Sequence, residues 1–358
     1  MAGPAARPET LLERVNALRA LDLEVASRAS IAVVVPLVLL VLAGRIDWAA
    51  YASFGAMTSL YGRSEPYRLR ARTVSVAAAC LLVSVAAGLL MSVTGAALPA
   101  LVLGLMLVIT VGILVASTYG LFPGTPIFFV FAYLVCAQVP APADEMLPRL
   151  LVAVASAALA WLLTMSGWAA RRLAGDRSGD LFKALPRTPL LNPAAYRDTQ
   201  VWLTILQNLV GVLLAGGLAL AWGIGHPYWA VVSVVAVLPP PRAAHSLSRA
   251  GHRIVGTVLG VVVTGLVLLP EPSVWGLIAV IAISQFGAEI LIGKHYGAAL
   301  LFITPLALTV AHLAGSVAVP TLLVDRVVET ALGGVVAVLI VLAARGLARR
   351  RSRLPAQS

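Results

Sequence analysis

The chain carries little charge. Only 11% of its 358 residues are Asp, Glu, Lys or Arg, whereas 60% are hydrophobic and the mean hydropathy is +0.95. This composition excludes an ordinary soluble domain. Residues 73–143 contain no charged side chain. Because one bilayer crossing takes roughly 20 apolar residues, this run predicts about three crossings.

Cysteine is scarce as well. The two cysteines, Cys80 and Cys136, fall inside apolar segments, so no disulfide framework is expected. The histidines lack the spacing of a helical metal site, and no phosphate-binding loop of the GxxxxGK[ST] type occurs. No nucleophile with a neighbouring base is recognisable. We therefore predict a protein that is not an enzyme and has no cofactor, no metal and no nucleic-acid partner.

The apolar segments predict an all-α polytopic membrane protein with about twelve transmembrane helices, six in each half. The predicted spans are 30–44, 48–62, 73–94, 98–118, 124–140, 149–168, 201–223, 228–241, 254–270, 273–293, 296–314 and 326–345. With the amino terminus inside, all basic residues except Arg45, Arg149 and Arg326 are cytoplasmic, as the positive-inside rule favours. The prediction is a multi-pass protein of the bacterial inner (plasma) membrane with both termini cytoplasmic.

An internal repeat organises the chain. Three residues of the first half recur 181 positions later, and a second set recurs 177 positions later. Trp48, Arg68 and Arg72 recur as Trp229, Arg249 and Arg253, while Tyr119-Gly120 and Arg149 recur as Tyr296-Gly297 and Arg326. Because six spans give each half the same orientation, we predict two parallel six-helix repeats.

This repeat sets the predicted domain organisation. Residues 1–28 are an amphipathic cytoplasmic segment, 29–172 the first six-helix repeat, 173–199 a cytoplasmic linker, 200–346 the second six-helix repeat, and 347–358 a basic cytoplasmic tail.

The repeated arginines are the first candidate site. Each pair, Arg68 with Arg72 and Arg249 with Arg253, follows a break in the second span of its half, and interrupted spans point to transporter binding sites. Each pair shares one face at a helix start, where like charges and the helix dipole both disfavour cations. A carboxylate or phosphate would offset that cost, so these four are predicted to bind substrate. The alternative is a set of snorkelling, topology-setting arginines.

Two tryptophans and an intramembrane acid are further candidates. Trp48 and Trp229 open the short spans and are either interface anchors or part of the lining of a substrate pathway. Glu289 lies well inside a span, one turn after Gln285. These two are predicted to form a proton-coupling site, unless Glu289 simply pairs with Lys294.

A third pair of arginines begins the last span of each half. Arg149 and Arg326 are predicted either to form an anion filter at a pore mouth or to pair with a neighbouring acid, Glu145 or Glu329.

The second half also resembles a known family. The run His226-Pro227-Tyr228-Trp229-Ala230, followed by Arg253-Ile254-Val255-Gly256-Thr257, resembles the fusaric acid resistance protein-like (FUSC) family of membrane transporters. The resemblance implies efflux of organic, aromatic carboxylic anions by secondary transport, with the bilayer and a small organic anion as partners. An anion channel of the malate-channel type and a non-transporting scaffold that binds anionic lipid or a partner protein remain alternatives. A homo-oligomer and a periplasmic export partner also stay open.

Overall fold

The structure is a computed structural model that describes residues 20–175, 185–240, 246–315 and 318–353. Most of the predicted amphipathic segment, residues 1–28, lies outside the described residues. The described part is helical with connecting loops and contains no strand. The predicted all-α class is therefore confirmed.

The first half contains six principal helices with short 3-10 turns. They are α2 (Ala20–Leu42), α3 (Ala49–Ala56), α4 (Tyr67–Val93), α5 (Leu98–Tyr119), α6 (Ile127–Gln138) and α7 (Met146–Ala174), with η1 (Ile46–Trp48), η2 (Met57–Leu60) and η3 (Ala143–Glu145). After the 3-10 turn η5 (Ala195–Arg197), the second half contains α9 (Thr199–Ala221), α10 (Tyr228–Val237), α11 (Ser246–Leu268), α12 (Val274–Ile292), α13 (Tyr296–Ala314) and α14 (Val319–Arg353).

Nine helices of the described residues are long and apolar enough to cross a membrane. They are α2, α4, α5, α7, α9, α11, α12, α13 and α14. The helices α3, α6 and α10 are shorter than a full crossing. The prediction of a multi-pass membrane protein is thus confirmed, with nine long spans where the sequence predicted about twelve.

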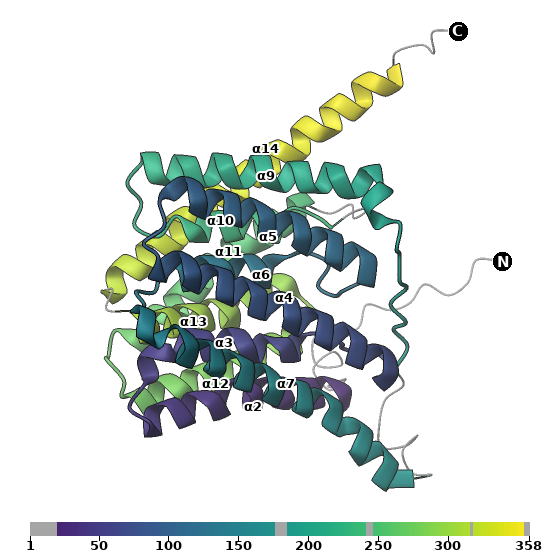
Figure 1. The fold of residues 1–358 in the computed structure, drawn as a ribbon. Coiled ribbons are helices and arrows are strands. Elements are labelled where there is room, and N and C mark those ends of the chain that lie inside the picture. The colour runs from purple at the N-terminus through teal and green to yellow at the C-terminus, as the bar shows by residue number, and fades with distance from the viewer. Residues whose placement is uncertain (1–19, 176–184, 241–245, 316–317, 354–358) are drawn as a thin grey trace, which may run out of the picture.

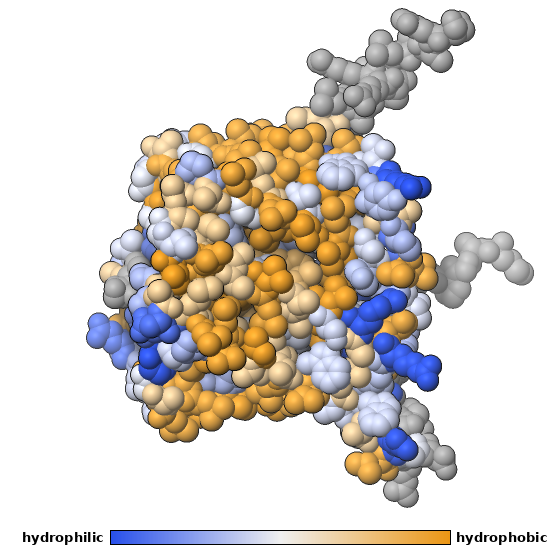
Figure 2. Space-filling view, in the orientation of Figure 1, coloured by the Kyte–Doolittle hydropathy of each residue, from blue (hydrophilic) through white to orange (hydrophobic). Residues whose placement is uncertain are grey.

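The helices run between two ends of the molecule, and a hydrophobic belt separates these ends (Figures 1 and 2). One end, which we call the linker face, carries residues 185–198 and the start of α2. The other, the loop face, carries the tight turns at Gly44, Gly95 and Gly223 (Figure 1). This arrangement lets the long helices cross a bilayer with polar groups at both surfaces.

The short helices α3 and α10 form the centre of the protein, and every residue in both is buried. Each packs on the last helix of its half, α3 on α7 and α10 on α14. Glycine allows these close contacts, because a Cβ at Gly55 would strike the Ala153 carbonyl and one at Gly333 would strike that of Ala230.

The amino terminus of α10 is capped from another helix. The buried Glu329 carboxylate of α14 accepts hydrogen bonds from the backbone N–H groups of His226, Trp229 and Ala230, at 2.9, 3.0 and 3.3 Å. The first N–H groups of a helix have no partner within the helix, and the helix dipole favours a negative charge there. Glu329 therefore fixes the position of α10, and with it Trp229.

Removing this cap should destabilise the protein. Glu329→Ala removes the carboxylate acceptor of the His226 and Ala230 N–H groups, whereas the Trp229 N–H keeps the His226 carbonyl at 3.0 Å, so we expect stability to fall by about 1–3 kcal/mol, with Glu329→Gln intermediate. Asp144→Ala is the control, because Asp144 is exposed in the turn before α7. Melting in detergent measures the effect, and equal melting temperatures for the two alanine variants would contradict it.

The charge asymmetry predicts that the linker face is cytoplasmic. Thr94 is exposed at the loop face, and Ala194 is exposed at the linker face. In a background with Cys80 and Cys136 replaced by Ala, Thr94→Cys should react with a membrane-impermeant thiol reagent in intact cells. Ala194→Cys should react only after permeabilisation, and the reverse pattern would invert the assignment.

Candidate functional site

A cavity of about 130 Å³ lies at the centre of the helical bundle, where α6, α10, α12 and α13 meet. Five residues singled out from the sequence line this central cavity: Trp229, Arg253, Gln285, Glu289 and Arg326. One water needs roughly 10–15 Å³, so the space is enough for more than a single solvent molecule. The structure thus brings together residues from four segments far apart in the sequence.

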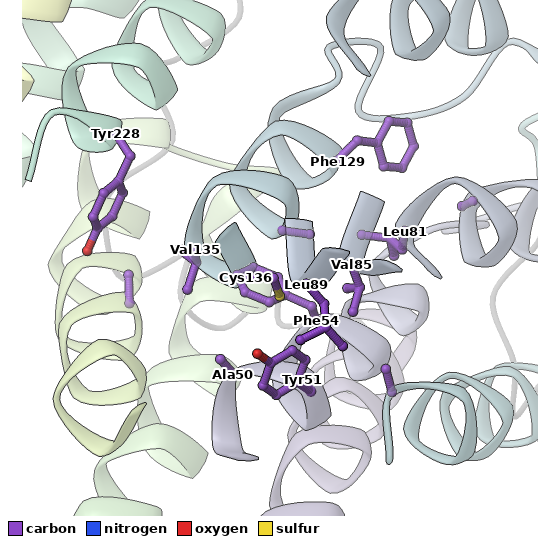
Figure 3. Packing of buried hydrophobic residues seen from close by; sticks show 14 of the residues in the cluster. Ala50, Tyr51, Phe54, Leu81, Val85, Leu89, Phe129, Val135, Cys136 and Tyr228 are labelled. Carbon is purple, nitrogen blue, oxygen red and sulfur yellow. The ribbon is translucent and has the colours of Figure 1, made fainter. Parts of the chain in front are cut away.

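Aromatic rings form much of the remaining wall. Phe54 of α3 meets Phe131 of α6 edge to face, with ring centroids 5.2 Å apart, and Phe131 lies 5.1 Å from Trp229. Figure 3 shows how α3 is held, with Tyr51 and Phe54 lying near Cys136 of α6. A planar apolar group would find offset and edge-on ring contacts here.

Arg326 is the most unusual polar group of the cavity. Its guanidinium carbon lies 3.9 Å from the centre of the Trp229 ring, and only 2% of the residue is exposed. The Nε and Nη1 atoms have no hydrogen-bond partner among the described residues. The Glu329 carboxylate, one turn along α14, is used to cap α10. A buried guanidinium with two unsatisfied donors is costly, so an anion in the cavity would stabilise Arg326.

Arg253 and Arg249 both contact one tyrosine. Arg253 donates from Nη1 to the Tyr296 hydroxyl at 3.1 Å, and its Nε has no partner among the described residues. Arg249 lies over the ring of Tyr296 at 4.4 Å and donates from Nε to the Ala236 carbonyl at 2.6 Å. Tyr296 therefore positions both arginines. Its recurrence with Tyr119 was the signal in the sequence, although no role in the site was predicted for it.

Glu289 pairs across the two halves of the chain. Its Oε2 lies 3.6 Å from Nη1 of Arg63, which also donates to the Glu289 carbonyl at 3.0 Å. The sequence offered Lys294 as a partner, whereas the ion pair in the structure is formed with Arg63. Arg63 follows Gly62, whose φ of +75° ends the short span. A basic residue inside this break could have indicated the ion-pair partner of Glu289 from the sequence alone.

The first-half mates of Trp229 and Arg326 do not line the central cavity. Arg149 donates from Nε and Nη2 to Glu145 at 3.0 and 2.6 Å, and from Nη1 to the Tyr51 hydroxyl at 3.1 Å. The Trp48 indole donates to the Glu145 carboxylate at 3.2 Å. The guanidinium carbon of Arg45 lies 3.8 Å from the centre of the Trp48 ring. Arg149 is thus neutralised within a loop-face cluster, as the acid-pairing alternative expected.

The loop-face cluster holds Arg45 in its charged form. Hydrogen bonds to Asp47 and Glu145 raise the pKa of its guanidinium above the usual value. The charge of Arg45 is therefore retained at any physiological pH.

Arg68 and Arg72 also lie away from the cavity. Arg68 is exposed, and Arg72 donates to the Pro189 carbonyl at 3.2 Å. That carbonyl belongs to the linker segment 185–198, which lies across the first half. Arg187 in this segment pairs with Glu65 and donates to the Gly120 carbonyl at 2.6 Å, and burial lowers the pKa of its guanidinium. The four predicted substrate-binding arginines are therefore not gathered at one site.

No group of three or more His, Cys, Asp or Glu side chains within the described ranges could hold a metal ion. His252 and His295 approach each other, with ring centroids 5.1 Å apart. Nδ1 of His295 accepts a hydrogen bond from the Ala298 N–H, so its lone pair is engaged in capping α13.

The chain was compared with known proteins. It is 29% identical over 171 residues to the uncharacterized membrane protein YvaC of Bacillus subtilis. The aligned region covers 45% of this chain and 27% of that protein. It is also 29% identical over 134 residues to the uncharacterized protein slr1298 of Synechocystis, covering 37% of this chain and 17% of that protein. The chain thus spans under a third of the length of these relatives. No solved structure matches it.

The family comparison agrees with the resemblance found in the sequence. The matching family model is described as fusaric acid resistance protein-like, and the match runs from α9 into α14. Trp229, Arg253, Glu289 and Arg326, which line the central cavity, all lie inside the matched region. Residues 200–340 of the chain are therefore similar to the fusaric acid resistance protein-like family.

Proposed function

We propose that this membrane protein transports organic anions and that the central cavity holds the carboxylate of the substrate. The observation that carries the proposal is the buried guanidinium of Arg326, with two nitrogens lacking partners among the described residues, facing a cavity that also contains Arg253. Guanidinium groups bind carboxylates through paired, charge-assisted hydrogen bonds. The fusaric acid resistance protein-like segment supports a role in membrane transport or resistance.

The aromatic walls favour an aromatic carboxylate as the substrate. Trp229, Phe131 and Phe54 lie in contact along one side of the cavity, and Phe128 also lines it. A ring bound here gains both apolar burial and ring contacts. The membrane potential itself would drive an anion outward, by about 2.3 kcal/mol per charge for each 100 mV. Efflux by secondary transport therefore requires no nucleotide hydrolysis.

The packing supports a two-repeat architecture in the inner membrane. Within the halves, α4 packs on α6 as α11 packs on α13; between the halves, α2 packs on α12 and α9 packs on α5. Such reciprocal contacts are what two parallel repeats about an axis along the membrane normal would produce. In this proposal α3, α6 and α10 bring the number of membrane helices to twelve, and the linker face is cytoplasmic. The second repeat carries Arg253 and Arg326, which bind the substrate.

The repeat supplies matched controls for the anion site. Arg326→Ala should weaken the affinity for benzoate by roughly ten- to a hundred-fold, because losing a charge-assisted contact costs about 1.5–3 kcal/mol. Arg253→Ala should act in the same direction. Arg253→Lys should restore only part of the affinity, because Lys lacks the bidentate fork. The mates Arg149→Ala and Arg72→Ala should leave the affinity unchanged, because neither residue lines the cavity.

Benzoate flux into proteoliposomes, normalised to folded protein, measures these affinities. Wild-type affinity in Arg326→Ala and Arg253→Ala would end the anion-site proposal. Voltage-clamp current that scales with potential without saturating would indicate a channel with the same site. The absence of any flux in the wild type would favour a scaffold.

Glu289 is proposed to couple protons to transport. Glu289→Gln preserves the shape of the side chain but cannot ionise, so folding should be retained while the dependence of benzoate flux on the pH at the linker face is lost. Arg63→Gln is the control, because it breaks the same ion pair and leaves the acid in place. If both variants lose stability equally and the pH dependence persists in Glu289→Gln, the pair is structural.

A further inference from the structure

A second pocket lies at the loop-face end of the molecule, beside the central cavity. It has a volume of about 270 Å³ and is lined by the ends of α6, α13 and α14 together with the start of α10. Ala311 of α13 lines this loop-face pocket, one residue after Val310 of the central cavity. Likewise Tyr228 lines the pocket, and Trp229 lines the cavity. Consecutive residues of α10 and of α13 thus line the two spaces, which are therefore neighbours.

His226 is the ionisable imidazole of this pocket. Its Nδ1 lies 2.6 Å from Oδ2 of Asp325 on α14, within hydrogen-bond distance. Because a carboxylate can only accept, Nδ1 carries the hydrogen, and Nε2 is the nitrogen of the neutral ring that can take a proton. Histidine is the side chain that ordinarily changes its charge within the physiological pH range.

The described helices around His226 carry both charged and uncharged side chains. α14 contributes Asp325, Glu329 and Arg326, and the Glu329 carboxylate is already bound to three backbone N–H groups. α10 contributes Tyr228, whose ring meets the imidazole edge to face at 5.7 Å. The residues of α6 and α13 that line the pocket are uncharged, although His312 follows Ala311 on α13.

We infer that His226, held by Asp325, is a proton-binding site at the loop-face mouth, and that its proton strengthens the binding of the anion at Arg326. This inference rests on the proposed anion transport. Asp325 precedes Arg326 in α14, and the ring of Tyr228 lies 4.8 Å from that of Trp229, over which Arg326 stacks. A proton on His226 therefore adds positive charge beside the site that holds the carboxylate.

The direction of the effect follows from charge alone. Neutral His226 leaves the negative charge of Asp325 uncompensated, which repels an anion, whereas protonated His226 cancels it. Lowering the pH at the loop face should therefore tighten anion binding. A unit charge within about 10 Å of an anion, at an effective dielectric constant between about 20 and 80, changes affinity by roughly two- to fifteen-fold.

The test uses oriented proteoliposomes and benzoate offered at the loop face, with the pH of the linker face held constant. The carboxylate remains ionised throughout, because carboxyl groups titrate near pH 4. Between pH 8 and pH 6 at the loop face, the wild type should bind benzoate about two- to fifteen-fold more tightly. His226→Asn keeps a side-chain N–H for Asp325 but cannot be protonated, so flux should persist and the pH response should vanish.

His312→Asn is the matched control and should keep the wild-type response. A His226→Asn variant that still tightens its binding between pH 8 and pH 6 overturns the inference while leaving anion transport intact. Absence of benzoate flux in the wild type overturns the proposed function instead.

If His226→Asn does not fold, Asp325→Asn gives the answer. This substitution removes the negative charge that the neutral ring leaves uncompensated, so Asp325→Asn should bind benzoate more tightly than the wild type at pH 8. Wild-type affinity of Asp325→Asn at pH 8 also overturns the inference.

Discussion

The structure depends on how buried arginines are compensated inside a bilayer-sized apolar bundle. A guanidinium removed from water requires hydrogen bonds or a counter-ion, because its desolvation is expensive. Arg149 obtains both from Glu145 and Tyr51, whereas Arg326 has a stacked indole and an acid that is already engaged elsewhere. This difference separates a residue that holds the fold together from one that is available to an anion.

The same constraint explains why the two halves, so similar in element order, differ in chemistry. In the first half, the linker supplies the Pro189 carbonyl to Arg72, and Glu145 binds both Trp48 and Arg149. In the second half, Glu329 turns to the backbone of α10 and leaves Arg326 beside Trp229. The acid lies four residues before Arg149 but three residues after Arg326, and this change of position alters the use of the equivalent arginine.

Much of the architecture could be predicted from the sequence, because apolar length and charge-free runs follow directly from the cost of placing polar groups in lipid. The span predicted at 296–314 coincides with α13, and that at 98–118 with α5 to within one residue. Three predicted spans proved shorter: α6 begins after Pro126, α10 begins after Pro227, and α3 passes into the 3-10 turn η2 after Ala56. Those helices are buried by neighbouring helices rather than by lipid.

The sequence by itself determined that this is a multi-pass helical membrane protein, and it identified Trp229, Arg253, Gln285, Glu289 and Arg326. Only the tertiary structure decided that these five share a cavity, because they come from four separate helices, α10, α11, α12 and α14, that all border it. The tertiary structure also decided the partners of Glu289 and Arg149. It revealed the contacts that His226, Tyr296 and Arg63 make. Such pairings depend on the relative position of helices distant in the sequence, which hydropathy and spacing do not encode.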